Sequence, residues 1–577
     1  MLHQVKSCPG HRLLGSLNEM VTFRILSLMN PINYQISDPQ IISISKRTKH
    51  TMIAKRINLT SSEARLRSLL LDVAKVVDES NEFKDKLILR FAGGWVRDKL
   101  LGIPSNDIDV AVNVVTGTRF TSEVWNYLQK NAHLEKHHLN AQDFGRFYMT
   151  VANPEKSKHL ETSTMTVMGY DVDFVNLRKE TYTGESRNPQ MEFGTPEEDA
   201  LRRDATINSI FYNIHTEEIE DYTGGLNDLA AKRIRTPIDP KTTFLDDPLR
   251  VLRLIRFANR LNFEIERECE VFMHDAEVLD AFQRKISRER VLSEIMKMLK
   301  GQNPYAALRI FDRLGLYFNI FVDTASTESA PTPDITNWKI AYGCLQEMIS
   351  TSSLSCILEE SDYDTCWLLA AYTPWSSVKE RPQYVGKAKL AWGGYMAREA
   401  LKLENKKISL ISGSLKHCRD IINLKDAIIK GSSEIYRRDY VANLIRGWDL
   451  QGKWQLQVIF SILVEAMNSE YSEDMSRVYQ RNFRSWDKFI DHLEDLKLMN
   501  APSIKNLVDG EALMEALDLK AGKWVAQTLK FCMDWTLRYP DANDPREVIE
   551  EVQKRRLELG IPTCVSNKAN KLHQINK

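Results

Sequence analysis

The chain of 577 residues carries 78 Lys and Arg against 78 Asp and Glu, and this balance excludes the overall positive charge of an indiscriminate nucleic-acid binder. One core rarely serves more than roughly 250 residues, so we expect three or four units. No window approaches the roughly 18 apolar residues of a membrane span, and the eight cysteines form no CxxC pair or Cys/His cluster, so we predict a globular protein without membrane span, disulfide or zinc.

The first fifty residues differ from the rest of the chain. They are rich in Lys, Arg and Ser and contain only two acidic residues, Glu19 and Asp38. This composition is typical of mitochondrial presequences, and a disordered extension is the alternative. Internal methionines such as Met29 and Met52 offer later starts that drop some or all of the segment. We therefore predict a presequence or disordered extension at 1–50 and protein in the mitochondrion, cytoplasm and nucleus.

The next part of the chain predicts a mixed α/β domain. Thr60 and Glu63 form a capping box, and apolar residues at helical spacing follow them. The further elements are a strand over 87–92, a short helix over 96–101 and strands over 107–112 and 171–177. We assign residues 60–215 to this catalytic head.

The remainder predicts helices. From about Asp246 the apolar residues recur at helical spacing, with few alternating segments. A Ser/Thr/Pro-rich stretch at 324–332 predicts a surface loop. The predicted units are a neck at 216–300, a helical body at 301–480 and a helical tail at 481–577; the pattern makes no prediction of the oligomeric state.

A glycine pair ends the first strand of the head. Gly93 and Gly94 stand between the strand and the short helix, and Arg97 lies in the first helical turn. Backbone N–H groups without side chains beside a helix start suit a phosphate, and a guanidinium adds a bidentate contact. A tight turn is the structural alternative.

Acidic residues follow at alternate positions. Asp107 and Asp109 face one side of the second strand, with backbones roughly 6.6 Å apart. Such carboxylates can converge on two divalent ions about 3.5 to 4 Å apart. Asp173, on a further strand, is our third carboxylate facing the metals. A solvated edge strand is the alternative, but beside a phosphate-binding turn the three predict nucleotidyl transfer with two Mg²⁺ ions.

Several motifs together resemble class II tRNA nucleotidyltransferases and bacterial-type poly(A) polymerases of the polymerase beta-like superfamily. They are GGWVRDKLLG with DIDVAV, EEDALRRDATINSIFYN, DYTGGLNDL, DDPLRVLRLIRFANRL and ISRERVLSEIMKML, within residues 85–300. LVDGEALMEALDLKAGKW at 507–524 is similar to the tail of eukaryotic CCA-adding enzymes. The resemblance implies a polymerase beta-like head with a mixed sheet, followed by helical neck, body and tail.

The resemblance also implies roles for residues. Asp107 and Asp109 would be metal ligands, and Gly93, Gly94 and Arg97 would hold the triphosphate. The ribose and phosphates of the nucleotide would be contacted by Arg203, Asp204 and Asn208. Gly224 and Gly225 would form a hinge between head and neck.

DDPLR resembles the base-reading motif EDxxR, with Asp246 where bacterial members have Glu; the role of Asp246 stays open. We place Asp247 and Arg250 on one helix face, where Asp247 accepts and Arg250 donates hydrogen bonds to a base edge. Cytosine and adenine present a donor beside an acceptor, whereas uracil and guanine present the reverse. The pair therefore predicts selection of CTP and ATP without a nucleic-acid template.

The polar segment 178–197 is, by resemblance, a flexible element that helps the change from CTP to ATP; an inert surface loop is the alternative. The predicted function is addition of the 3′-terminal CCA to tRNA that lacks it, with release of pyrophosphate. A poly(A) polymerase of the same superfamily and a non-catalytic RNA-binding relative are the alternatives.

Overall fold

The structure is a computed structural model, and Met1–Thr51 and Met52–Lys577 form separate units. It describes residues 56–150, 162–182, 189–323, 331–351, 354–378, 383–385, 388–449, 453–472 and 474–562. The predicted presequence at 1–50 lies outside the described residues, as do residues 324–330 of the predicted surface loop. Among the described residues no helix is long and apolar enough to cross a membrane.

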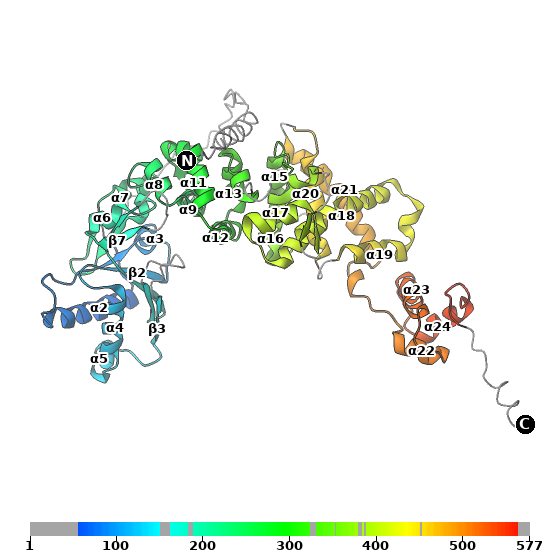
Figure 1. Cartoon of the computed structure of the whole chain (residues 1–577), viewed down its shortest axis with the longest axis horizontal. Helices are drawn as coiled ribbons and strands as arrows, with labels where there is room; N and C mark the ends of the chain where they lie inside the picture. The colour runs from blue at the N-terminus through cyan, green and yellow to red at the C-terminus, as the bar shows by residue number, and fades with distance from the viewer. Residues whose placement is uncertain are drawn as a thin grey trace, which may run out of the picture. The chain divides into compact units, whose positions relative to one another are not determined.

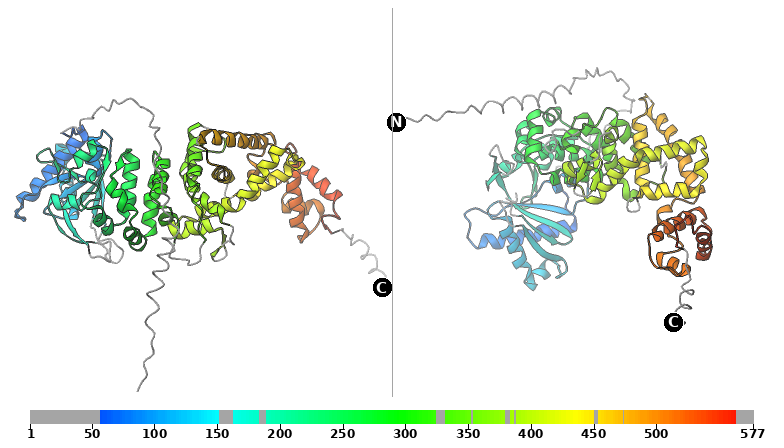
Figure 2. Two further views of the ribbon diagram at one scale, coloured as in Figure 1. Left: turned by 90° about the horizontal axis from the view of Figure 1, so that it is seen from above. Right: turned by 45° about the vertical axis from the view of Figure 1, so that its right-hand side comes forward.

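The head is built on a seven-stranded mixed sheet with the order β3-β4-β5-β2-β1-β8-β9. Its central pair, β2 and β5, is parallel, and the other neighbours are antiparallel. Figure 2 shows these strands side by side, in blue to green. The strands are β1 Leu89–Ala92, β2 Asp107–Val112, β3 Phe144–Thr150, β4 Thr162–Val167, β5 Tyr170–Asn176, β8 Ile210–Asn213 and β9 Glu218–Asp221.

Short two-stranded sheets accompany the main sheet. They pair β6 Arg178–Thr181 with β7 Gln190–Phe193, β10 Arg233–Ile234 with β11 Glu264–Ile265, and β12 Gln383–Val385 with β13 Ala388–Leu390. The first of these pairs joins the two ends of segment 178–197, whose middle, 183–188, lies outside the described residues.

The α-helices of the head and neck are α2 Ser61–Glu79, α3 Gly94–Leu100, α4 Gly117–Leu128, α5 Asn131–Lys136, α6 Pro196–Leu201, α7 Gly225–Ala230, α8 Pro240–Asp246, α9 Leu249–Leu261, α10 Arg267–Met273, α11 Ala276–Lys285 and α12 Arg288–Leu299. Those that follow are α13 Pro304–Arg313, α14 Tyr317–Phe321, α15 Trp338–Thr351, α16 Tyr363–Tyr372, α17 Trp392–Leu401, α18 Asn405–Lys430, α19 Arg438–Trp448, α20 Trp454–Met467, α21 Met475–Asp495, α22 Gly510–Leu517, α23 Trp524–Arg538 and α24 Pro545–Lys554. Short 3₁₀ turns are η2 Thr206–Asn208, η3 Glu360–Asp362, η4 Thr373–Ser377, η5 Ser433–Tyr436 and η6 Ala501–Ser503. Figure 1 shows this change from a head with a sheet to mainly helical parts.

The head core lies between α2, α4 and one face of the sheet. The predicted capping box is present, since Thr60 Oγ1 accepts from Glu63 N at 3.3 Å and Glu63 Oε2 accepts from Thr60 N at 2.6 Å. Buried leucines of α2 join Phe91 and Val110 of the sheet in one apolar cluster. On the other face of the sheet, Ala92 of β1 and Ala111 of β2 belong to a smaller buried cluster with Phe211.

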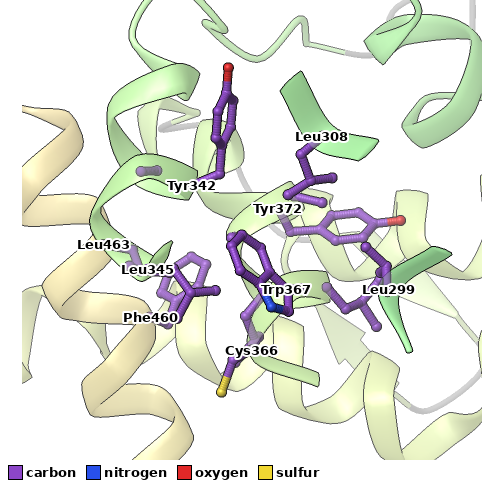
Figure 3. Packing of buried hydrophobic residues seen from close by; sticks show 14 of the residues in the cluster. Leu299, Leu308, Tyr342, Leu345, Cys366, Trp367, Tyr372, Phe460 and Leu463 are labelled. Atoms are coloured by element: carbon purple, nitrogen blue, oxygen red, sulfur yellow. The ribbon is translucent and has the colours of Figure 1, made fainter. Parts of the chain in front are cut away.

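A second, much larger core runs through the helical part. It includes residues from Ala205 in the head to Leu537 in α23. Figure 3 shows Trp367, Leu345 and Phe460 packed together at its centre, from α16, α15 and α20. A third, separate cluster spans Val508 to Ile561.

Candidate active site

The predicted glycine turn joins β1 to α3 in a conformation that needs glycine. Gly93 has φ +67°, and a Cβ there would lie 3.0 Å from Arg203 Nη1 and 3.2 Å from Asp109 Oδ2. Gly94 follows as the first residue of α3 and also lines the cavity described below. The turn therefore lies close to both a carboxylate and a guanidinium, and the Gly93 N–H donates to the Ile210 carbonyl at 3.3 Å.

The three predicted carboxylates come from the central parallel strands. Asp109 is in register with Asp173, and Asp107 is in register with Asp171. Burial raises the pKa of Asp109; Arg203 opposes this rise, and Asp173 and Asp107 add to it. Asp109 lines the cavity, whereas Asp107 and Asp173 do not. Thr164 Oγ1 donates to Asp173.

The chemistry of this pair fits a hard divalent cation. Asp107 and Asp109 offer carboxylate oxygens, the donors that Mg²⁺ prefers. The charge of Asp107 helps to raise the pKa of Asp109, and a bound cation would offset this repulsion. Within the part of the chain that the structure describes, no group of three or more His, Cys, Asp or Glu could hold a metal. Asp107 and Asp109 therefore stay a predicted metal-binding pair, and Asp173 is a neighbour that accepts a hydrogen bond from Thr164.

The RRD segment is held by one buried carboxylate that the sequence reasoning did not single out. Asp199 is 1% exposed and accepts from Arg203 Nε at 3.0 Å and Arg202 Nε at 2.9 Å. Burial would raise the pKa of Asp199, but the two arginines lower it. Arg202 and Arg203 are therefore not on a solvated helix face, because each packs against this anion.

A chain of hydrogen bonds connects the next predicted residues. Asp204 accepts from Arg253 Nε at 2.6 Å and from Asn208 Nδ2 at 3.0 Å. Asn208 Oδ1 in turn accepts from Arg97 Nη1 at 2.6 Å. Burial would raise the pKa of Asp204, yet Arg253 and Asn208 lower it to about 2. Asp204, Asn208 and Arg97 thus form one network that joins the head to α9.

The prediction that Asp247 and Arg250 share a helix face is wrong. Asp247 follows the end of α8 in an extended conformation, φ −135° and ψ 97°, and Pro248 precedes α9. The residue before a proline is driven away from the helical region. Arg250 alone lies in the first turn of α9. Both side chains nevertheless line the same cavity.

The hydrogen-bonding capacity that Asp247 and Arg250 keep for a ligand can be counted. Asp247 accepts from Leu249 N at 3.2 Å and Arg290 Nη2 at 3.0 Å. Arg250 donates to the carbonyl of Arg202 at 2.7 Å and makes longer contacts of 3.3 and 3.4 Å to the Thr243 carbonyl and a tyrosine hydroxyl. A carboxylate has about four acceptor positions and a guanidinium five N–H groups, so each keeps about two for a ligand.

Asp246 and the hairpin 178–197 lie close by. Asp246 is half-buried, its pKa is raised by burial, and it does not line the cavity. In the hairpin, Glu180 accepts from Arg178 and Arg202, and Tyr182 contributes to the cavity wall. The described ends of this segment are therefore structural parts of the site.

The turn predicted as a hinge is tightly held. Asp221 accepts the backbone N–H groups of Gly225 and Leu226, both at 2.9 Å. Gly224 has φ +78°, and a Cβ on Gly225 would lie 2.2 Å from the Thr206 carbonyl oxygen. The glycines are needed for this close approach; motion at the turn stays a prediction.

One cavity of about 610 Å³ brings nine of the eleven predicted site residues together. Its other lining residues come mainly from segment 178–202, α9 and α12, and many are arginines. The arginines are Arg97, Arg178, Arg202, Arg203, Arg250, Arg253, Arg256, Arg260 and Arg290. Among the side chains that line the cavity, nine guanidiniums face four carboxylates, Asp109, Glu180, Asp204 and Asp247. This excess of positive charge suits a polyanionic ligand.

Four of these arginines lie on one helix face. Arg250, Arg253, Arg256 and Arg260 repeat every three or four residues along α9. The sequence carried this signal in PLRVLRLIRFANRL, but we singled out only Arg250. The carboxylates that pair with Arg253, Arg256 and Arg260 lie on other elements and could not be inferred from the spacing.

Comparison with families and curated proteins places these motifs in context. Residues 89–235 match the model described as the Poly A polymerase head domain, and 262–327 match a probable RNA and SrmB- binding site of polymerase A. Nucleotidyltransferase lcsQ of Purpureocillium lilacinum is 43% identical over 88% of this chain and 94% of its own. The mitochondrial CCA tRNA nucleotidyltransferase of Saccharomyces cerevisiae is 35% identical over 85% of this chain and 92% of its own length. The tRNA nucleotidyltransferase cca2 of Schizosaccharomyces pombe is 33% identical over 85% of this chain and 97% of its own length.

Solved structures share the fold. A CCA-adding enzyme in apo form II matches with a TM-score of 0.58 and 20% identity, covering 85% of this chain and 96% of the other. A CCA-adding enzyme in complex with CTP matches with a TM-score of 0.54 and 22% identity, covering 84% and 94%. The predicted fold class, an α/β head followed by helical parts, is confirmed.

Proposed function

The chain belongs to the family of fungal tRNA nucleotidyltransferases with a poly(A) polymerase head domain, and from this premise we propose that it adds the 3′-terminal CCA to tRNA from CTP and ATP and releases pyrophosphate. The observation that carries the proposal is the single cavity that gathers the glycine turn, Asp109, the RRD segment, Asp247 and Arg250. Relatives with CCA-adding names, matched over nearly their whole length, support the choice of substrate.

The phosphates would lie at the glycine turn and its arginines. Gly94 lines the cavity at the start of α3, and Arg97 reaches the cavity from the same helix. The N–H of Gly93 donates to the Ile210 carbonyl at 3.3 Å and holds the turn in place. Arg203 lies within 3.0 Å of a Cβ built on Gly93, so it borders the same space. Fixed cationic donors around a triphosphate stabilise the charge that develops during phosphoryl transfer.

Two Mg²⁺ ions are part of the proposal, with Asp107 and Asp109 as their protein ligands. When bound, Mg²⁺ supplies activation of the attacking 3′-hydroxyl and neutralisation of the leaving pyrophosphate. Asp173, beside Asp109 on β5, is proposed to support the same centre. Asp204 and Asn208, in the network with Arg97, would recognise the ribose.

The base would be read by Asp247 and Arg250. Asp247 can accept from the exocyclic amine of cytosine or adenine, and Arg250 can donate to the neighbouring ring nitrogen. Uracil and guanine would set oxygen against carboxylate and N–H against guanidinium. Leaving charged groups unpaired costs roughly 1 to 3 kcal/mol each, which is enough to select the base.

We also propose mitochondrial, cytoplasmic and nuclear pools. The basic composition of residues 1–50 and the mitochondrial names of two yeast relatives support the first of these. Alternative starts at internal methionines would supply the others.

The decisive experiment is incorporation of labelled CTP and ATP into tRNA that ends before CCA. We expect at most three added nucleotides, with C before A. A long A tract would instead assign a poly(A) polymerase, and no incorporation in the presence of Mg²⁺ would assign a non-catalytic RNA-binding relative. tRNA that already ends in CCA is the control and should gain nothing.

A further inference from the structure

We propose that Arg260 is a further phosphate-binding arginine of this cavity, and that Asp98 positions Arg260 and Arg97 together so that α9 completes the triphosphate site begun by the glycine turn. The inference rests on the proposed function, because it names a further contact for the same nucleotide. Neither Arg260 nor Asp98 was singled out from the sequence.

Asp98 is a buried carboxylate shared by two arginines. It is 3% exposed, and its Oδ1 accepts from Arg97 Nε at 2.8 Å, while its Oδ2 accepts from Arg260 Nη2 at 3.0 Å. Arg97 belongs to α3 of the head and Arg260 to the last turn of α9. One anion therefore fixes two guanidiniums from elements more than 160 positions apart in the sequence.

The charge of this group favours an anionic ligand. Two guanidiniums share one carboxylate, which leaves one positive charge without a partner among these three side chains. Both arginines line the cavity, whereas Asp98 does not. The carboxylate thus lies behind the arginines, and their free N–H groups are available to the cavity. A partly buried excess charge of this kind is stabilised by a bound phosphate.

The exposures of the two arginines differ in a useful way. Arg97 is 3% exposed, and its guanidinium lies 5.7 Å from the centre of the Phe257 ring. The Arg260 side chain is 50% exposed. Arg97 is thus fixed by packing on one side and by Asp98 on another, while Arg260 depends on Asp98 and keeps most of its N–H groups for a ligand. Arg260 can therefore be removed with little effect on the core.

The test uses the whole chain and inorganic tripolyphosphate, a probe without base or ribose. Arg260→Ala should raise the dissociation constant for tripolyphosphate about tenfold, the loss expected for one charge-assisted hydrogen bond, and Arg260→Lys should recover part of it. The matched control is Arg313→Ala. Arg313 is 53% exposed and pairs with Glu270 away from the cavity, so its loss should leave the constant unchanged.

Asp98→Asn tests the positioning role. The KM for CTP and ATP should rise together, and kcat should fall less. The ratio of kcat/KM for CTP over UTP should stay unchanged, because Asp98 holds Arg97 and Arg260 rather than the base-reading pair. Asp98→Glu should raise the KM less than Asp98→Asn does. A smaller folded fraction would instead lower the apparent kcat for both nucleotides and leave KM unchanged.

Two results would overturn the proposal. One is Arg260→Ala binding tripolyphosphate as tightly as the unaltered chain, and the other is an unaltered chain that incorporates CTP without binding tripolyphosphate. Incorporation into CCA-lacking tRNA by the unaltered chain tests the proposed function separately, so the two failures can be told apart.

Discussion

Replacement of Asp204 by Asn should weaken both the fold and the recognition of ribose. Asp204 is 8% exposed and accepts from Arg253 and Asn208. Its pKa of about 2 lies below the ordinary 3.8. The difference corresponds to roughly 2 kcal/mol in favour of the ionised, folded form. Asp204→Asn should therefore lower the free energy of unfolding by roughly this amount at neutral pH.

The pH dependence follows from the direction of the shift. Because the pKa of Asp204 is lowered in the folded chain, ionised Asp204 contributes its full stabilisation above about pH 4. This stabilisation is lost as the pH falls through about 2. The difference between the unaltered chain and Asp204→Asn should thus be full at pH 6 and shrink towards pH 3. Urea unfolding followed by circular dichroism at both pH values measures it.

Asp439→Asn provides the matched control. Asp439 is also buried and has a pKa lowered by arginines although burial raises it, but it lies in α19, outside the cavity. Its loss should reduce stability and leave the preference for CTP over dCTP unchanged, whereas Asp204→Asn should reduce both. Equal stability of the unaltered chain and Asp204→Asn at pH 6 would refute the argument, and an unchanged ratio of CTP to dCTP would remove Asp204 from ribose recognition.

The other predictions concern the metals, the base and the N-terminus. Asp107→Ala or Asp109→Ala should abolish incorporation of CTP and ATP in the assay above while tRNA binding stays largely intact; a tenth of normal activity in both variants would contradict the metal assignment. Asp247→Ala or Arg250→Ala should lower the ratio of kcat/KM for CTP over UTP by about tenfold or more, and an unchanged ratio would mean that the base is read elsewhere. Removal of residues 1–51 should leave activity in solution unchanged and abolish import into isolated mitochondria; equal import of both forms would exclude a presequence.

The local patterns of the head could be predicted from the sequence because they depend on short-range chemistry. Alternation placed Asp107 and Asp109 on one side of β2, and the strand 107–112 agrees with the structure. The glycine pair marked the turn because Gly93 needs a positive φ. The capping box fixed the start of α2 within one residue.

The rest of the site depends on contacts between distant segments. Spacing in DDPLR suggested a shared helix face, but Pro248 ends that regularity and turns Asp247 out of the helix. This signal was present in the sequence and was overlooked. Asp199 was also visible in the sequence, three and four residues before Arg202 and Arg203. Asp98 carries no local mark of its second partner, since Arg260 reaches it only when α9 folds against α3.

The RRD segment and the residues that follow it are held by two apolar cores at once. Ala205 and Ile207 belong to the large core of the helical part, whereas Ile210, three residues later, belongs to the head core. Local opening of either core would therefore displace the segment before the chain unfolds globally. Amide hydrogen exchange along 203–210 should then follow the less stable of the two cores. The substitution Ile255→Ala would open a cavity in the large core at α9. It should loosen this segment and weaken nucleotide affinity, although Ile255 does not contact the ligand.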